Sequence, residues 1–143
     1  GFPLGAFIYS KEIMSSLSKN PPLGHITTFG GHPISCTAAI SSLEIINEKG
    51  FLEQIEEKSN LIRTILDDVF GKDNITGEGL MLAIHFEKET KCQSVISYCL
   101  ENGLIADWFL FAPNCLRISP PLIADNQLIR KACGIIKEAN KNT

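Results

Sequence analysis

The spacing of apolar residues changes along this 143-residue chain, and each spacing predicts a different kind of element. Residues 51–70, FLEQIEEKSNLIRTILDDVF, repeat apolar residues at helical spacing with Glu and Lys opposite, which predicts an amphipathic helix. Residues 75–87, ITGEGLMLAIHFE, alternate apolar and other residues after a Gly-x-Gly interruption, which predicts a strand with one buried face. The residues expected on that buried face are Leu80, Leu82, Ile84 and Phe86.

Similar patterns, with proline and glycine as breaks, predict the remaining elements. Pro33 suits the first turn of a helix because its missing N–H needs no partner there, and Gly50 is expected to end or kink that helix. In the last helix Leu128 and Ile129 are expected to face inward together with Ala132, Ile135 and Ile136. The predicted elements are a buried strand over 3–10, a short helix over 11–17, helices over 33–49, 91–103 and 124–140, and strands over 104–111 and 115–123 joined at residues 112–114.

The order of these elements predicts the fold class. Strand, helix, strand, strand and helix after residue 70 are typical of a small α+β layer, in which a small sheet carries helices on one face. The elements before Gly50 are too few to close a core alone. We therefore predict two parts, 1–49 as a segment of one domain and 50–143 as a small α+β domain.

The composition and charge of the chain favour some classes of protein and argue against others. A hydrophobic fraction of 44% with 20% charged residues is typical of a globular protein, and a net charge of −3 argues against nucleic-acid binding. The five cysteines have no C-x-x-C spacing, so we interpret them as core residues in a reducing compartment. No signal segment or membrane span is evident, which favours a cytoplasmic protein. The opening GFPLGAFIYS lacks an initiator methionine, so we expect a longer polypeptide.

The stretch HITTFGGHP, residues 25–33, is the most specific local feature. Its glycines precede a predicted helix, so free N–H groups and the hydroxyls of Thr27 and Thr28 could hold a phosphate or carboxylate. A tight turn that caps the helix is the more common use of such residues. A metal site at His25 and His32 would lack a third nearby ligand.

Arg117 is the second candidate, because a guanidinium is unexpected in the apolar run CLRISPP. It could clamp a substrate carboxylate, or it could point to solvent from an edge strand. Asp107 and Trp108 could line a pocket, but a capped turn with a core tryptophan is the more common explanation of such residues. His85 is expected at an exposed strand rim, and Glu78 is expected to be an exposed acid between turn glycines.

Four motifs occur in an order that resembles the C-terminal part of the class III aminotransferases. They are GFPLGAF, TTFGGHP, GEGLMLAI and LRISPPL, and the resemblance extends over essentially the whole chain. This family includes the acetylornithine and ornithine aminotransferases. Membership implies the aspartate-aminotransferase-like fold (fold type I) and the cofactor pyridoxal 5'-phosphate.

The resemblance also implies roles for particular residues. The lysine that forms the Schiff base would lie upstream of Gly1, because Lys11 is on the wrong side of the first motif. Thr28 matches the threonine that binds the cofactor phosphate in the partner subunit's active site, so a homodimer is implied. Thr27 matches a more variable hydroxyl position, and His32 stands where the family usually has Asn.

Arg117 matches the family arginine that pairs with a glutamate or with a substrate carboxylate. The resemblance thus implies that the whole protein is a transaminase, which moves an amino group from an amino acid or amine to a 2-oxo acid. It also implies that this chain contains none of the catalytic residues. Two alternatives remain open: a mutase, decarboxylase or racemase of the same fold, and a non-catalytic module that binds anions or a partner.

Overall fold

The computed structural model describes residues 2–22 and 24–143 of the chain. It divides into two compact units, Gly1–Phe51 and Leu52–Thr143, whose placement relative to one another is not determined.

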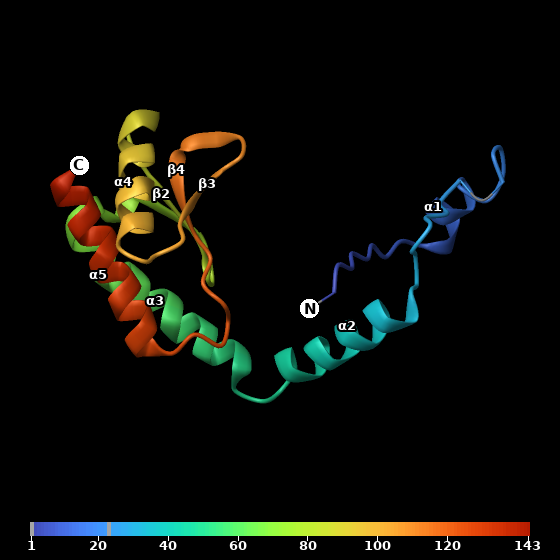
Figure 1. Ribbon diagram of the computed structural model, residues 1–143. Helices are drawn as coiled ribbons and strands as arrows, with labels where there is room; N and C mark the ends of the chain where they lie inside the picture. Colours follow the sequence, from blue (N-terminus) through green and yellow to red (C-terminus); the bar gives the residue numbers. More distant parts are fainter. Residues whose placement is uncertain (1, 23) are drawn as a thin grey trace. The chain divides into compact units, whose positions relative to one another are not determined.

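A four-stranded antiparallel sheet organises the second unit (Figure 1). Its strand order is β1-β2-β4-β3, so β2 and β4 are interior strands. Residues Ile84 and Leu116 face each other across the central pair, as do Leu82 and Ile118. The strands are β1 (Ile75–Glu78), β2 (Met81–His85), β3 (Asp107–Phe109) and β4 (Ala112–Ile118).

Three helices bury one face of this sheet. The apolar side chains of β2 and β4 on that face form one cluster with residues of all three helices. Leu66, Val95 and Ile129 represent α3, α4 and α5 in the cluster and are at most 3% exposed. The sheet with helices on one face is thus confirmed. The helices are α3 (Phe51–Phe70), α4 (Glu89–Glu101) and α5 (Asn126–Asn142), and the 3-10 turn η1 (Lys72–Asn74) follows α3.

The predicted alternation of residues 80–86 is confirmed. Leu80, Leu82, Ile84 and Phe86 are all buried, whereas Met81 between them is 60% exposed. The predicted single strand is in fact the hairpin of β1 and β2: Gly77 and Glu78 are the last residues of β1, and the turn lies at Gly79 and Leu80. Gly77 has φ +115°, and a Cβ there would collide with the backbone of β2, so only glycine fits this position.

Two local predictions in the second unit are wrong. The turn between β3 and β4 lies at Leu110 and Phe111, and residues 112–114 begin β4, where Asn114 exchanges hydrogen bonds with the backbone of Phe86. Leu128 is 55% exposed. The carboxylate of Asp125 accepts the Leu128 N–H at 2.7 Å and caps α5, so Leu128 lies in the first turn of the helix. Of Leu128 and Ile129, which were both expected to face inward, only Ile129 is buried.

The first unit contains two helices, α1 (Lys11–Ser15) and α2 (Pro33–Ile46). The hydroxyl of Ser10 caps α1 by accepting the Ile13 N–H at 3.3 Å. Residues 3–10 are not the predicted buried strand: they form no helix or strand, and Ile8 is 95% exposed. A strand needs a neighbouring strand for its backbone hydrogen bonds, and residues 2–22 and 24–51 contain no strand.

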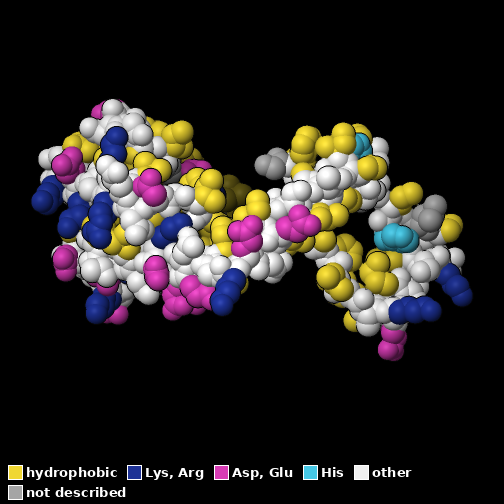
Figure 2. All heavy atoms as spheres, turned by 90° about the horizontal axis from the view of Figure 1, so that it is seen from below, with side chains coloured by type: hydrophobic (Ala, Val, Ile, Leu, Met, Phe, Trp, Pro, Cys, Tyr) yellow, Lys and Arg dark blue, Asp and Glu magenta, His cyan; other side chains and the backbone are white. Residues whose placement is uncertain are grey.

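No residue is buried within the described part of the first unit. Figure 2 shows hydrophobic side chains over its surface, and Phe29 and Ile26 are among the most exposed of them. Among the helices of residues 2–22 and 24–143, none is both long and apolar enough to cross a membrane.

Candidate functional site

Two backbone turns fold residues 27–32 into a compact loop. Gly30 N–H donates to the carbonyl of Thr27 at 3.3 Å, and His32 N–H donates to the carbonyl of Phe29 at 3.2 Å. A Cβ on Gly30 would lie 2.5 Å from Thr27 Oγ1, and Gly31 has φ +70°. The first glycine thus leaves room for the Thr27 hydroxyl, and the second permits the left-handed backbone that leads into α2.

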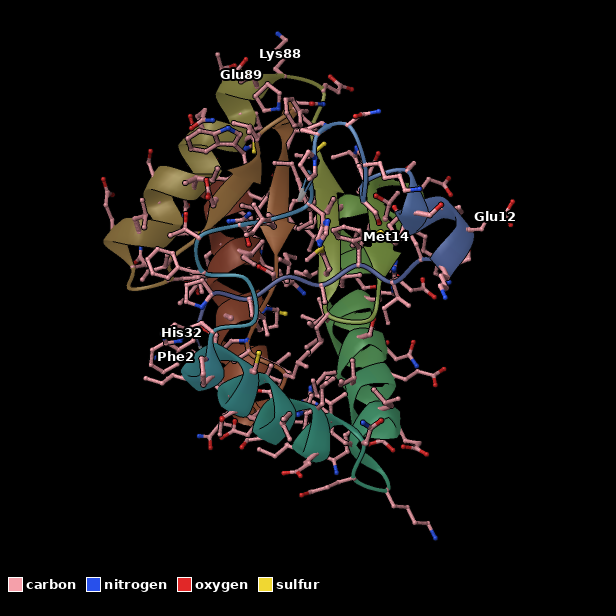
Figure 3. The ribbon with its side chains drawn as sticks, turned by 90° about the vertical axis from the view of Figure 1, so that its right-hand side faces the viewer. Phe2, Glu12, Met14, His32, Lys88 and Glu89 are labelled. Carbon is pink, nitrogen blue, oxygen red and sulfur yellow. The ribbon has the colours of Figure 1, made fainter. Side chains whose placement is uncertain are left out.

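Helix α2 begins at Pro33, as predicted, and leaves its first amides available. His32 is the N-cap residue and makes no side-chain capping bond, and Figure 3 shows its ring at the start of the helix. The first bonded amide is that of Cys36, which donates to His32 O at 3.0 Å. Within the described residues, the N–H groups of Ile34 and Ser35 therefore have no backbone partner. They lie at the positive end of the helix dipole, where an anion is stabilised.

The threonine hydroxyls are also available. Thr27 and Thr28 are exposed, and neither side chain is hydrogen-bonded to another residue that the structure describes. The ring of His32 contacts that of Phe29 edge to face, with centroids 6.4 Å apart. The loop and the first turn of α2 therefore offer hydroxyl and amide N–H donors, which are the kinds of group that bind a phosphate.

No group of three or more His, Cys, Asp or Glu side chains that could hold a metal ion occurs within residues 2–22 and 24–143. The loop donors listed above are N–H and O–H groups, which bind anions rather than cations. The chemistry of the loop therefore favours an anionic ligand.

Arg117 lies in the second unit, on the sheet face opposite the helices. It is on β4, which is an interior strand and not the edge strand of the solvent-facing alternative. Its side chain is nevertheless 40% exposed, because this face of the sheet carries no helix of the second unit. Alternation along β4 places its neighbours Leu116 and Ile118 in the core and Arg117 on the open face.

A carboxylate partner for Arg117 comes from the same unit. Asp107 pairs with Arg117 across β3 and β4, and its Oδ2 lies 3.0 Å from the Arg117 Nη2. The other carboxylate oxygen accepts the Trp108 N–H at 2.8 Å. Asp107 is thus a strand residue and not part of a capped turn, and Trp108, at 39% exposure, is not a core residue.

His85 lies at the exposed end of β2, as predicted, but it is not isolated. Its Nε2 is 2.7 Å from Thr76 Oγ1, and its Nδ1 is 3.2 Å from Cys115 Sγ. Sequence reasoning missed this group because 30 residues separate His85 from Cys115, and only the strand register brings them together. Glu78 is exposed at the end of β1, as expected.

The cysteines are mostly core residues, as predicted. Cys92, Cys99, Cys115 and Cys133 are buried, and Cys36 is the half-buried exception. Burial raises the pKa of Cys92 and of Cys133 to about 11, and it raises the pKa of the Cys99 and Cys115 thiols as well. These thiols therefore carry their protons at neutral pH.

The fold and the loop motif point to one class of protein, and comparison with known sequences agrees. Residues 1–139 match the family described as Aminotransferase class-III. The chain therefore belongs to the class III aminotransferases, and the resemblance inferred from the four motifs is confirmed.

Individual relatives specify the branch of the family that this chain resembles. The acetylornithine aminotransferase of Haemophilus ducreyi is 30% identical over 138 residues, a stretch that covers 96% of this chain and 33% of that protein. The ornithine aminotransferase of Emericella nidulans is 30% identical, again over 96% of this chain but only 31% of that protein. The chain thus spans about a third of the length of these relatives.

Solved structures agree with the sequence comparison. A Bacillus anthracis aminotransferase matches with a TM-score of 0.77 and 27% identity, covering 93% of this chain and 34% of the other. An acetylornithine aminotransferase from Elizabethkingia anophelis matches with a TM-score of 0.72 and 26% identity over 91% of this chain and 35% of the other. The mixed α/β arrangement therefore corresponds to part of a class III aminotransferase structure.

Proposed function

We propose that the whole protein to which this chain belongs is a pyridoxal-phosphate-dependent transaminase. It transfers an amino group from an amino acid or amine to a 2-oxo acid, and it acts as a cytoplasmic homodimer. Residues 1–49 are the last segment of its large cofactor domain, and residues 50–143 form its small domain. The observation that carries the proposal is the set of free donors on the loop of residues 27–32 and the first turn of α2, which suit a phosphate in a chain of this family.

The loop residues hold the cofactor phosphate. Thr28 donates its hydroxyl to a phosphate oxygen, and Thr27 offers a second hydroxyl beside Gly30. The amides of Ile34 and Ser35 add N–H donors at the positive end of α2. Bound pyridoxal phosphate supplies a conjugated ring that takes up electrons from the substrate. Because the loop serves the cofactor of the neighbouring subunit, dimerisation completes the site.

Arg117 binds a carboxylate of the substrate. Its planar guanidinium offers two parallel N–H donors, of which Asp107 occupies one at 3.0 Å. An incoming carboxylate therefore shares the guanidinium with Asp107 or displaces it. The pair is half exposed, so the displacement costs little: exposed ion pairs are worth about 0.2–1 kcal/mol.

A two-substrate assay on the whole protein tests this function. We expect an amino acid and a 2-oxo acid to react alternately, so that the amino acid alone converts one equivalent of cofactor, the 2-oxo acid added afterwards restores it, and both together give turnover. Release of carbon dioxide from the amino acid, or an internal shift of its amino group, would instead identify a decarboxylase or a mutase. An absence of cofactor absorbance in the purified whole protein would refute the proposal and leave a non-catalytic module.

A further inference from the structure

A row of residues, one from each strand, crosses the open face of the sheet. The strand register places Thr76 opposite Ala83, Ala83 opposite Arg117, and Arg117 opposite Asp107. Side chains that lie opposite each other on neighbouring antiparallel strands have Cβ atoms about 4.5–5.5 Å apart. Arg117 therefore has the methyl group of Ala83 as its neighbour on one side and the carboxylate of Asp107 on the other.

The carboxylate of Asp107 is held by two hydrogen bonds. Its Oδ1 accepts the N–H of Trp108 at 2.8 Å, and its Oδ2 accepts from Arg117 Nη2 at 3.0 Å. Because each oxygen has its own partner, Asp107 can keep its place when another anion approaches Arg117. Nη2 carries a second N–H, and Nη1 and Nε carry others, so the guanidinium still offers parallel donors to a further carboxylate.

The side of Arg117 toward β2 has room for that carboxylate. The side chain of Ala83 ends at its Cβ, so it does not extend over the neighbouring guanidinium. Arg117 is 40% exposed, and it makes no other side-chain hydrogen bond with the part of the chain that the structure describes. A ligand carboxylate can therefore reach the guanidinium beside Ala83 while Asp107 remains bound.

The charges on this face weaken the binding of an anion. Arg117 is the one Lys or Arg on the four strands, whereas two carboxylates, those of Glu78 and Asp107, lie on the same face by alternation. Asp107 is in contact with Arg117, so it also lies close to any carboxylate that binds there. That carboxylate is attracted by the guanidinium and repelled by Asp107 over nearly the same distance.

A weakened carboxylate site suits a reaction with two alternating substrates. The amino acid and the 2-oxo acid would use one site in turn, so each product must leave before the next substrate binds. Binding energy that is the same for the substrate and the transition state lowers KM without raising kcat. A resident carboxylate therefore reduces affinity that the reaction does not need and favours release.

We propose that Ala83 and Asp107 together set the affinity of Arg117 for the substrate carboxylate. Ala83 leaves the position of the carboxylate open, and Asp107 stays paired with Arg117, orients it and weakens the binding. Both act on the carboxylate through the position and charge of Arg117, so they are positioning residues. The inference rests on the proposed function, because it requires Arg117 to bind a carboxylate of the substrate.

The charge of Asp107 is tested by kinetics on the whole protein. Asp107→Asn keeps the size of the side chain and one acceptor oxygen but removes the charge. We expect the KM of the amino acid and of the 2-oxo acid to fall about two- to fivefold at low salt, with kcat unchanged or lower. Asp107→Glu restores the charge and should bring both KM values back toward those of the wild type. A KM that is unchanged or higher in Asp107→Asn would overturn the role of Asp107.

A matched control and a salt series separate this charge from a general effect. Glu78→Gln removes an equal charge from the same face, but Glu78 lies on β1, two strands away from Arg117, so KM should change little. The difference between wild type and Asp107→Asn should shrink as salt rises, because the Debye length falls from about 30 Å at 0.01 M to about 3 Å at 1 M. A difference that is the same at all salt concentrations, or an equal effect of Glu78→Gln, would contradict the proposal.

The room beside Ala83 is tested by filling it. Ala83→Leu should raise the KM of carboxylate substrates at least about tenfold and leave the Kd of the cofactor unchanged, because it displaces the carboxylate from Arg117. Ala83→Val should have a smaller effect in the same direction and serves if the leucine variant does not fold, whereas Ala83→Ser should behave as the wild type. An unchanged KM in the folded Leu or Val variant would refute the position of the carboxylate. A wild-type protein without cofactor absorbance or turnover would refute the proposed function itself, whereas turnover with these KM values unaltered would refute this inference alone.

Discussion

Removing the Thr28 hydroxyl is the sharpest test of the phosphate loop. Thr28→Ala deletes one O–H donor from an exposed loop residue that makes no side-chain hydrogen bond to any described residue. The substitution should therefore change the stability of the cofactor-free chain little, and its effect should fall on the affinity for the cofactor. One hydrogen bond to a charged group is worth about 1.5–3 kcal/mol. At about 1.4 kcal/mol per tenfold change, the Kd for pyridoxal phosphate should rise roughly 10- to 150-fold.

The assay is a titration of the whole protein with pyridoxal phosphate after dialysis, followed by absorbance. Thr28→Ser keeps the hydroxyl and should bind nearly as the wild type does. Thr37→Ala is the matched control, because the Thr37 hydroxyl lies on the helix that follows the loop, α2, but donates to the carbonyl of Pro33 at 2.9 Å. An unchanged Kd in Thr28→Ala, or an equal loss in Thr37→Ala, would refute the role of Thr28.

Three further predictions concern the second unit. Arg117→Ala in the whole protein should raise the KM of carboxylate substrates while leaving the Kd of the cofactor unchanged; steady-state kinetics with both half-reaction substrates would show this. Gly77→Ala should lower the free energy of unfolding by about 2–4 kcal/mol, because alanine is strained at φ +115° and its Cβ would collide with the backbone of β2. Gly103→Ala, with φ +80° and open space, should cost about 1–2 kcal/mol in the same denaturant titration. Burial raises the pKa of Cys92 and Cys133 from 9.0 to about 11, so the unfolded chain loses these protons first as the pH rises. Stability should therefore fall between about pH 9 and 11, and a flat profile in denaturant titrations would contradict this.

Periodicity alone was enough to predict the main elements of the second unit. The helix over 51–70 and the alternation of residues 80–86 are confirmed, because each buries one continuous apolar stripe or face. The stretch over 3–10 is different: its apolar residues resemble a strand, but a strand forms only when a neighbouring strand satisfies its backbone hydrogen bonds. Local pattern carries no information about that neighbour.

The candidate sites were predictable only in part. Thr27, Thr28 and Arg117 were singled out by motif, and the loop turns and the start of α2 followed from glycine and proline chemistry. The partner of Arg117 was not predictable, since Asp107 meets it only through the register of β3 and β4. A bulge between Trp108 and Phe109 shifts that register, and no local sequence signal marks it.

The register of β4 links the core of the second unit to its candidate chemistry. Leu116 is fully buried against the helices, while Arg117 and Cys115 lie on the opposite face, next to Asp107 and His85 respectively. A shift of one residue would exchange the two faces and bury the guanidinium without a partner. Burying an unpaired charge costs several kcal/mol, which is a large part of the stability of a small domain. The apolar core therefore determines which way the candidate substrate arginine points, and core substitutions that loosen this register should affect substrate binding before they unfold the chain.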